Sequence, residues 1–158
     1  MITILLFVIC IFISLYALGI TNIAKLYFHR THEEINKVKK MIRINESLSK
    51  LLELLQDEKK VSDYLTKNHY QSVAIYGMGD LGQKLFNELA KEGVIATYTI
   101  DRNLVCESKY NMIPLSDKLP DVDIIIVTAV SNFDDIYLDL QKRVNGEIVN
   151  IEDVLWSL

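Results

Sequence analysis

The hydrophobic pattern of the chain begins with one long apolar segment at the N-terminus. Residues 1–24 include no charged side chain, and the apolar run over residues 2–20 is interrupted mainly by Thr3 and Ser14. A helix of this length spans roughly 30 Å at about 1.5 Å per residue, which matches the apolar core of a bilayer. A signal peptide needs a basic segment before the run and a small-residue cleavage site after it, and this run has neither. The run is also unlike a buried core helix, because no other segment of the chain could surround it. The pattern therefore predicts a transmembrane helix over residues 1–24.

The charges that flank this segment predict its orientation. No charged residue precedes the run, whereas the residues after it are mainly basic: Lys25, Arg30, Lys37, Lys39, Lys40 and Arg43, opposed by Glu33 and Glu34. Basic flanks of membrane-spanning helices stay on the cytoplasmic side. We therefore expect a single-pass protein of the cell membrane, with its N-terminus outside and everything after Lys25 in the cytoplasm.

The segment that follows has the periodicity of a helix. Residues 33–60 include neither glycine nor proline. Their apolar positions recur at steps of three and four, which is typical of one stripe of a helix; they are Ile35, Val38, Met41, Ile42, Ile44, Leu48, Leu51, Leu52 and Leu55. We predict a helical stalk or linker over residues 25–69. Its stripe, about three heptads long, has two alternative roles: association with a second copy or a partner protein, or packing against the chain's own domain.

The next segment predicts a β-α-β unit around a glycine-rich loop. Residues 72–76 and 94–100 are short runs rich in β-branched residues, and residues 80–92 between them have leucines at a spacing of four. The loop between the first strand and the helix reads G-x-G-x-x-G over residues 77–82 and includes half of the six glycines in the chain. This order of strand, glycine loop and helix is typical of dinucleotide-binding domains.

Each residue type of this motif has a physical role in holding a nucleotide. Gly77 permits the tight turn, Gly79 lets a phosphate approach the backbone, and Gly82 lets the helix and strand pack closely. The N-terminus of the helix offers N–H groups to an anion. Asp101, at the end of the second strand, is placed to accept hydrogen bonds from ribose hydroxyls, whereas Arg102 beside it would suit a 2′-phosphate. The choice between NAD and NADP therefore stays open.

Two observations weigh against simple phosphate binding in this loop. Asp80 lies between the second and third glycines, where its charge opposes a phosphate, and as an N-cap it would use the N–H groups that a phosphate needs. The alternative P-loop motif fails because Gln83 stands where that motif requires lysine.

The remaining pattern predicts a small α/β domain. Residues 111–115 indicate a short edge strand or a turn, residues 123–130 a strand buried on both faces, and residues 147–151 a last strand. We predict a doubly wound, mostly parallel Rossmann-like sheet over residues 70–158. Ligands of such sheets bind at the carboxyl ends of the strands. The predicted cofactor-binding residues are Gly77, Met78, Gly79, Asp80, Leu81, Gly82, Asp101, Arg102, Asn103, Thr128 and Ala129, with NAD(P) or a sugar nucleotide as candidate ligands.

Composition and charge exclude several other functions. Residues 1–70 contain ten Lys or Arg against seven acids, whereas residues 71–158 contain seven against fourteen. Nucleic acid is not expected as a partner, because an acidic domain binds it poorly. No histidine follows His69 and no Tyr-x-x-x-Lys occurs, so we assign no catalytic residue; Cys106 is interpreted as an inert loop thiol. His29, His32 and Glu33 share one helical turn but favour a polar rim, so we assign no metal site.

From residue 61 onward the sequence resembles the small Rossmann-like domains of bacterial cell-surface polysaccharide loci. The segments of resemblance are residues 61–65 (VSDYL), 72–82 (SVAIYGMGDLG), 99–103 (TIDRN), 119–123 (LPDVD) and 149–155 (VNIEDVL). Those domains are similar to the nucleotide-binding portion of sugar-nucleotide-modifying enzymes. The resemblance implies a role beside glycosyltransferases or sugar-nucleotide enzymes, and the N-terminal anchor departs from the soluble pattern of the family.

These observations lead to three hypotheses. The first is a membrane-anchored cytoplasmic domain that binds a nucleotide or sugar nucleotide, with an accessory or sensory role in envelope polysaccharide synthesis. The second is a scaffold without a ligand, which recruits partners through the stalk. The third is a subunit of a sugar-nucleotide oxidoreductase or epimerase that a partner chain completes.

Overall fold

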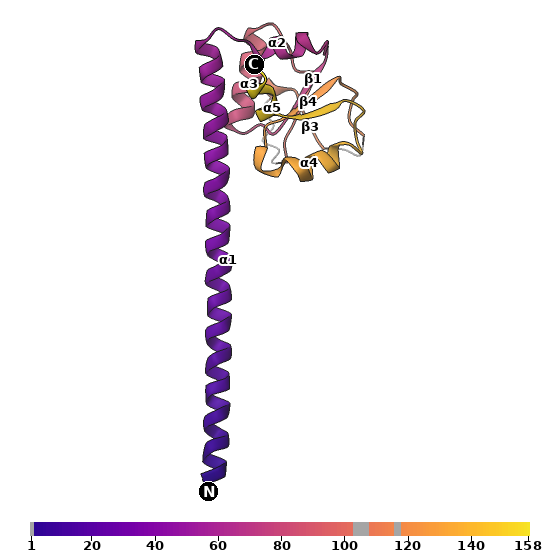
Figure 1. Ribbon diagram of the computed structural model, residues 1–158. Helices are drawn as coiled ribbons and strands as arrows, with labels where there is room; N and C mark the ends of the chain where they lie inside the picture. Colours follow the sequence, from indigo (N-terminus) through magenta and orange to yellow (C-terminus); the bar gives the residue numbers. More distant parts are fainter. Residues whose placement is uncertain (1, 103–107, 116–117) are drawn as a thin grey trace. The chain divides into compact units, whose positions relative to one another are not determined.

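A computed structural model describes residues 2–102, 108–115 and 118–158, and these divide into two compact units, Met1–Met41 and Ile42–Leu158. Figure 1 shows the helices and strands along the chain. They are α1 (Ile2–Gln56), α2 (Val61–Lys67), β1 (Val73–Tyr76), α3 (Asp80–Lys91), β2 (Tyr98–Ile100), β3 (Met112–Ile113), β4 (Ile124–Val127), α4 (Phe133–Leu140), β5 (Glu147–Asn150) and α5 (Ile151–Trp156), with short 3-10 helices η1 (Ser108–Tyr110) and η2 (Val130–Asn132).

The first unit is the N-terminal part of helix α1. Its large apolar side chains are exposed, including Phe7, Phe12 and Leu15. By length and composition α1 is apolar enough to span a membrane, and none of its apolar window is buried in the protein. The coarse prediction of a long apolar N-terminal helix is therefore confirmed.

The second unit is built on a five-stranded sheet of the described residues, in the order β3-β2-β1-β4-β5. All four strand pairings are parallel; Ala74 of β1, for example, lies opposite Tyr98 of β2 and Ile125 of β4. Every residue of β1 and β4 is buried, as expected for central strands covered on both faces. The predicted α/β class and parallel sheet are confirmed, and the strand order is consistent with a Rossmann-like fold.

Helices cover both faces of this sheet. One apolar cluster joins alternate residues of β1 and β4, such as Ile75 and Ile126, to α2, α3, α5 and the end of α1. The second joins the other set, such as Ala74 and Ile125, to α4. The alternation of side chains along each strand produces these two layers.

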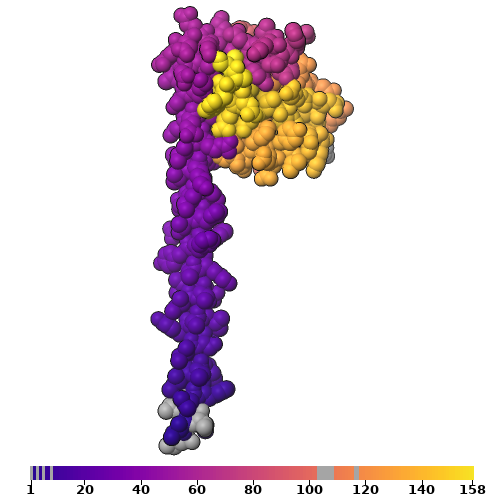
Figure 2. All heavy atoms as spheres, in the orientation of Figure 1, coloured from indigo at the N-terminus to yellow at the C-terminus, as the bar shows by residue number. Residues whose placement is uncertain are grey.

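The last turns of α1 belong to the second unit. Leu51 and Leu54 are buried in the core, and Arg43 pairs with Glu152 of α5. Figure 2 shows the C-terminal residues, in yellow, beside these turns, and Lys59 donates to the carbonyl oxygen of Leu158. Of the predicted stripe, Ile44, Leu48 and Leu51 pack against the chain's own domain, whereas Leu52 and Leu55 are exposed.

Several predicted boundaries were wrong by a few residues. The strand predicted over residues 94–100 begins at Tyr98, because Val94 closes the end of α3 by donating its N–H to the carbonyl of Leu89 at 2.8 Å. The strand predicted over residues 123–130 ends at Val127, where η2 follows. The N-cap of α3 is Gly79, and Asp80 is the first helical residue, so the prediction that Asp80 caps this helix was wrong.

Asp123 fixes the start of the central strands by accepting hydrogen bonds. Its Oδ2 accepts from the N–H groups of Gln71 and Ser72 at 2.7 and 2.8 Å and from the Ser72 hydroxyl at 3.0 Å. These donors lower the pKa of the Asp123 carboxyl below its ordinary value, the two backbone N–H groups contributing most. The stabilisation is complete above the pKa that the Asp123 carboxyl has in the unfolded chain. It is lost as the pH falls through the lower pKa that this carboxyl has in the folded chain.

We therefore expect Asp123→Asn to lower the melting temperature at pH 7 and to flatten its dependence on pH below about 4. Thermal unfolding followed by circular dichroism between pH 2.5 and 7 measures both effects. Asp135→Asn, which changes an exposed carboxylate on α4, is the control. Equal pH profiles for Asp123→Asn and the parent chain would contradict the prediction.

Candidate functional site

The glycine loop begins with a residue whose backbone excludes a side chain. Gly77 follows β1 with a φ of 95°, a conformation that other residues rarely adopt. Its N–H donates to the carbonyl oxygen of Ile100 at 2.8 Å. A Cβ at this position would lie 2.9 Å from Oγ1 of Thr128. A glycine at position 77 therefore allows the tight turn, and it also leaves room for Thr128 at the end of β4.

The other two glycines of the motif differ sharply in their surroundings. A Cβ on Gly82 would overlap the carbonyl oxygen of Gly77 and lie 3.0 Å from its carbonyl carbon, so α3 packs directly on the loop. Gly79 is exposed, and no atom lies within 4 Å of the position of its missing Cβ. The close approach expected at Gly82 and an open space at Gly79 are both present.

Asp101 connects the end of β2 to the glycine loop. Its Oδ2 accepts a hydrogen bond from the N–H of Met78 at 2.6 Å. Arg102, which is exposed, donates from Nε to the hydroxyl of Tyr76 at 3.0 Å. The carboxylate predicted to meet a ribose is thus held beside the loop, and the guanidinium predicted to meet a 2′-phosphate lies at the end of β1.

Thr128 connects the end of β4 to the same loop. Its side chain is buried, and its hydroxyl lies in donating distance of the carbonyl oxygens of Gly77, at 2.5 Å, and Tyr76, at 3.2 Å. The backbone N of Ala129 lies 3.4 Å from the position of a Cβ on Gly77. The ends of β1, β2 and β4 therefore meet at one edge of the sheet, around the glycine loop.

The remaining predicted residues divide between core and surface. Met78 of the loop and Leu81 of α3 are buried in the core, so their side chains pack rather than face a ligand. Asp80 is exposed at the first position of the helix. Asn103, like the thiol of Cys106, lies outside the described residues.

Gln83 also supports the loop, although the sequence analysis did not assign it to the site. Its Nε2 donates to the carbonyl oxygen of Met78 at 3.0 Å, and its Oε1 accepts from the hydroxyl of Tyr110 at 3.4 Å. The only sequence signal was a polar residue directly after the third glycine. Gln83 therefore links the first turn of α3 to the loop by a hydrogen bond.

The three metal-ligating side chains noted near the N-terminus do not form a site. His29 and Glu33 approach each other to 3.2 Å on the exposed surface of α1. Within residues 2–102, 108–115 and 118–158, no group of three such side chains is placed to hold a metal ion.

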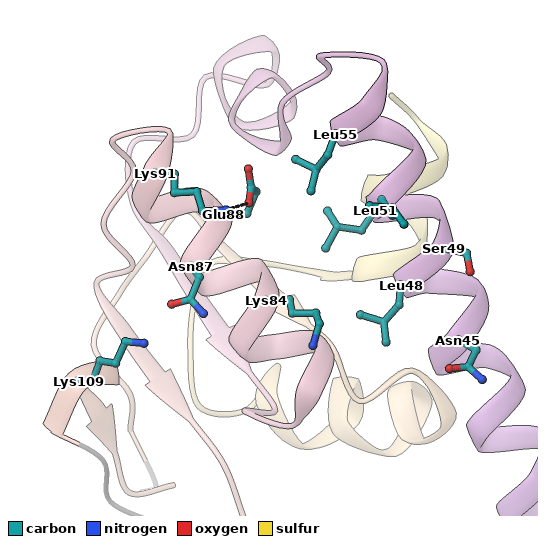
Figure 3. A pocket seen from close by; sticks show the side chains of 11 residues that line it. Asn45, Leu48, Ser49, Leu51, Leu55, Lys84, Asn87, Glu88, Lys91 and Lys109 are labelled. Atoms are coloured by element: carbon teal, nitrogen blue, oxygen red, sulfur yellow. Dashed lines mark hydrogen bonds and ion pairs between the residues drawn. The ribbon is translucent and has the colours of Figure 1, made fainter.

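A groove lies between the end of α1 and α3 (Figure 3). It is an open groove of about 810 Å³, with leucines of α1 on one wall and Lys84 and Lys91 of α3 on the other. Lys91 pairs with Glu88 at 2.9 Å. The sequence analysis did not find this groove, because it is formed by two segments distant in the chain.

The fold and the loop together define an α/β domain with a parallel sheet and a glycine-rich loop at the carboxyl edge, joined to a long apolar helix. Comparison with models of protein families, with curated proteins and with solved structures finds no match for this chain.

Proposed function

We propose that this protein is a membrane-anchored domain that binds a nucleotide or sugar nucleotide at its glycine loop. The observation in favour is the meeting of three strand ends around an open Gly79, at the edge where parallel α/β sheets bind ligands. Asp101 accepts a hydrogen bond from the N–H of Met78 in the loop, and the Thr128 hydroxyl donates one to the carbonyl oxygen of Gly77.

The charges around the loop indicate which part of a nucleotide it would recognise. Asp80 and Asp101 bring two carboxylates to the start of α3. Carboxylates accept hydrogen bonds from the hydroxyl groups of a ribose or a sugar, whereas they repel phosphate. A phosphate would approach at Gly79, where the helix N-terminus offers N–H groups. The ligand of this proposal is therefore held chiefly through its hydroxyl groups.

The N-terminal helix supports the anchor in this proposal. Its length and apolar composition suit a bilayer, and the basic residues that follow it favour a cytoplasmic domain and an external N-terminus. We expect the full chain to stay with membranes washed in alkaline carbonate, and a chain lacking residues 1–24 to enter the soluble fraction. Recovery of the full chain in the carbonate wash would contradict the anchor.

The proposed cellular role is accessory or sensory, in the synthesis of envelope polysaccharides. Two arguments support it: the resemblance of residues 61–158 to domains of such loci, and a membrane position, since lipid-linked glycans are assembled at the cytoplasmic face. A domain that binds a sugar nucleotide there would report its supply to neighbouring glycosyltransferases.

The test of ligand binding uses the full chain in detergent. Thermal unfolding is measured with NAD, NADP, UDP-sugars and coenzyme A; a ligand at 100 times its dissociation constant adds about 2.7 kcal/mol of stability. Gly79→Val is expected to abolish this shift, because its side chain fills the open space in front of the loop. The φ of −68° at Gly79 suits valine, so the variant itself should lose less than about 1 kcal/mol.

Ala90→Val is the matched control, because it adds a branched side chain at an exposed position of the same helix. It should keep the full ligand shift. No shift with any of these ligands, or a shift that Gly79→Val retains, would overturn the proposed site.

A scaffold without a ligand is the second candidate, and one contact favours it. The N–H of Met78, in the loop where a phosphate would bind, already donates to Asp101. Asp80→Ala separates the two candidates. In a ligand site it should change the affinity for the bound nucleotide, whereas in a scaffold it should change only the stability of α3.

A further inference from the structure

The end of α1 presents two apolar faces, and the domain covers one of them. Leu51 and Leu54 are 5% and 1% exposed in the core. Leu52 and Leu55, on the adjacent face, are 56% and 37% exposed, although they lie in the same turns. Leu48 lies between the two, partly buried against the core. Leu52 and Leu55 both line the groove between α1 and α3, and Figure 3 shows Leu55 on its α1 wall.

The exposed face has the spacing of a two-stranded coiled coil. Asn45, Leu48, Leu52 and Leu55 follow one another at steps of three, four and three, and the sequence extends this heptad pattern back to Met41 and Val38. In this register Val38, Asn45 and Leu52 occupy a positions, and Met41, Leu48 and Leu55 occupy d positions. A single asparagine at an a position, here Asn45, specifies pairing in parallel and in register.

The opposite wall of the groove has charges that complement the same helix. Lys84 and Lys91 are seven residues apart on α3 and both line the groove. In Figure 3 Lys84 lies opposite Leu48, and Glu88 lies between Lys91 and Leu55. Glu46 and Glu53 of α1 are also seven residues apart, directly after the a positions. Both are exposed, and Glu53 also pairs with Lys50 of its own helix at 2.8 Å.

We infer that the groove between α1 and α3 binds the α1 helix of a second copy of this chain, in parallel and in register. Each α1 fills the groove of the other copy, Asn45 meets its symmetry mate, and Lys84 and Lys91 face Glu46 and Glu53 of the second copy. The domain lies on the side of α1 that contains Leu51, a g position. In a parallel pair the g side of one helix faces the e side of the other. Glu46 and Glu53 occupy b positions, which adjoin that e side, so α3 of one copy lies on the same side as these acids of the other copy. One helix thus supplies both halves of a self-complementary interface.

Cysteine cross-linking of the full chain in detergent tests the register. In a background with Cys10 and Cys106 replaced by serine, Asn45→Cys should form a disulfide-linked dimer when copper phenanthroline oxidises the paired thiols. Asn36→Cys is the matched control, because Asn36 is exposed and lies nine residues earlier, about 900° around the helix and so on the opposite face. Equal cross-linking at both positions, or none at Asn45→Cys, would overturn the proposal.

Light scattering measures the interface itself in the full chain. We expect a protein mass twice the 18.2 kDa of one chain. Leu52→Glu should weaken the dimer at least about 100-fold, because it places an unpaired charge in the seam. Lys84→Glu should weaken it about two- to five-fold, and Glu46→Lys on the same chain should restore it.

Circular dichroism should show that these variants keep their helix content, since all three positions are exposed. A monomer in the parent chain, as expected if a different protein occupies the groove, would overturn the inference. Failure of Glu46→Lys to rescue Lys84→Glu would contradict the facing charges. None of these outcomes depends on a nucleotide, so they are separate from the test of the glycine loop.

Discussion

Replacing Leu54 by alanine should lower the free energy of unfolding by about 2–5 kcal/mol, one of the largest effects expected in this protein. Leu54 is 1% exposed and packs in the core shared by the end of α1, α2, α3 and α5. The substitution removes buried apolar surface and leaves a cavity, and both terms destabilise the domain. Thermal or denaturant unfolding of the full chain in detergent, followed by circular dichroism, measures the loss.

Leu138→Ala is the matched control, because Leu138 is 54% exposed on α4. Its cost should stay within about 0.5 kcal/mol, as for most surface substitutions. Equal losses for the two variants would show that the last turns of α1 do not pack on the domain. The comparison therefore tests whether the folded unit begins within α1.

Gly82→Ala should destabilise the domain by about 3 kcal/mol, although it adds a single methyl group. The new Cβ would overlap the carbonyl oxygen of Gly77, which is backbone and cannot turn aside as a flexible side chain can. Either the loop or the start of α3 must move, and the contact between Thr128 and Gly77 would move with it.

The same unfolding measurement with Gly79→Ala provides the control within the motif. No atom lies within 4 Å of that Cβ, so this variant should lose less than about 1 kcal/mol. A loss of that small size for Gly82→Ala would mean that the helix does not pack closely on the loop. The two variants thus distinguish Gly82, which allows close packing, from Gly79, which leaves space for a ligand.

The sequence predicted the elements of the sheet well where burial is continuous. The continuous isoleucines of β4 predict a strand that is buried on both faces. The leucines of α3 recur at a spacing of four and predict a helix with one buried face. The ends of the elements were less predictable. Val94 has high β propensity, yet its N–H closes the end of α3, since a local hydrogen bond competes there with the sheet.

The candidate site was predicted in position but not in its internal contacts. The motif placed Gly77, Asp101 and Thr128 at one edge, because parallel strands end at the same side of a sheet. It did not predict that Asp101 accepts the N–H of Met78, or that Gln83 braces the loop. Those bonds depend on distances between segments that only the folded chain defines.

By itself the sequence determined the long apolar helix, the α/β class and the glycine loop, because periodicity, length and glycine placement act locally along the chain. Only the tertiary structure decided which face of α1 is covered. Leu52 and Leu54 are the same residue two positions apart, yet one is 56% exposed and the other 1% exposed. The physical reason is that burial is decided by which elements pack against a face, and α2, α3 and α5 reach only one side of this helix.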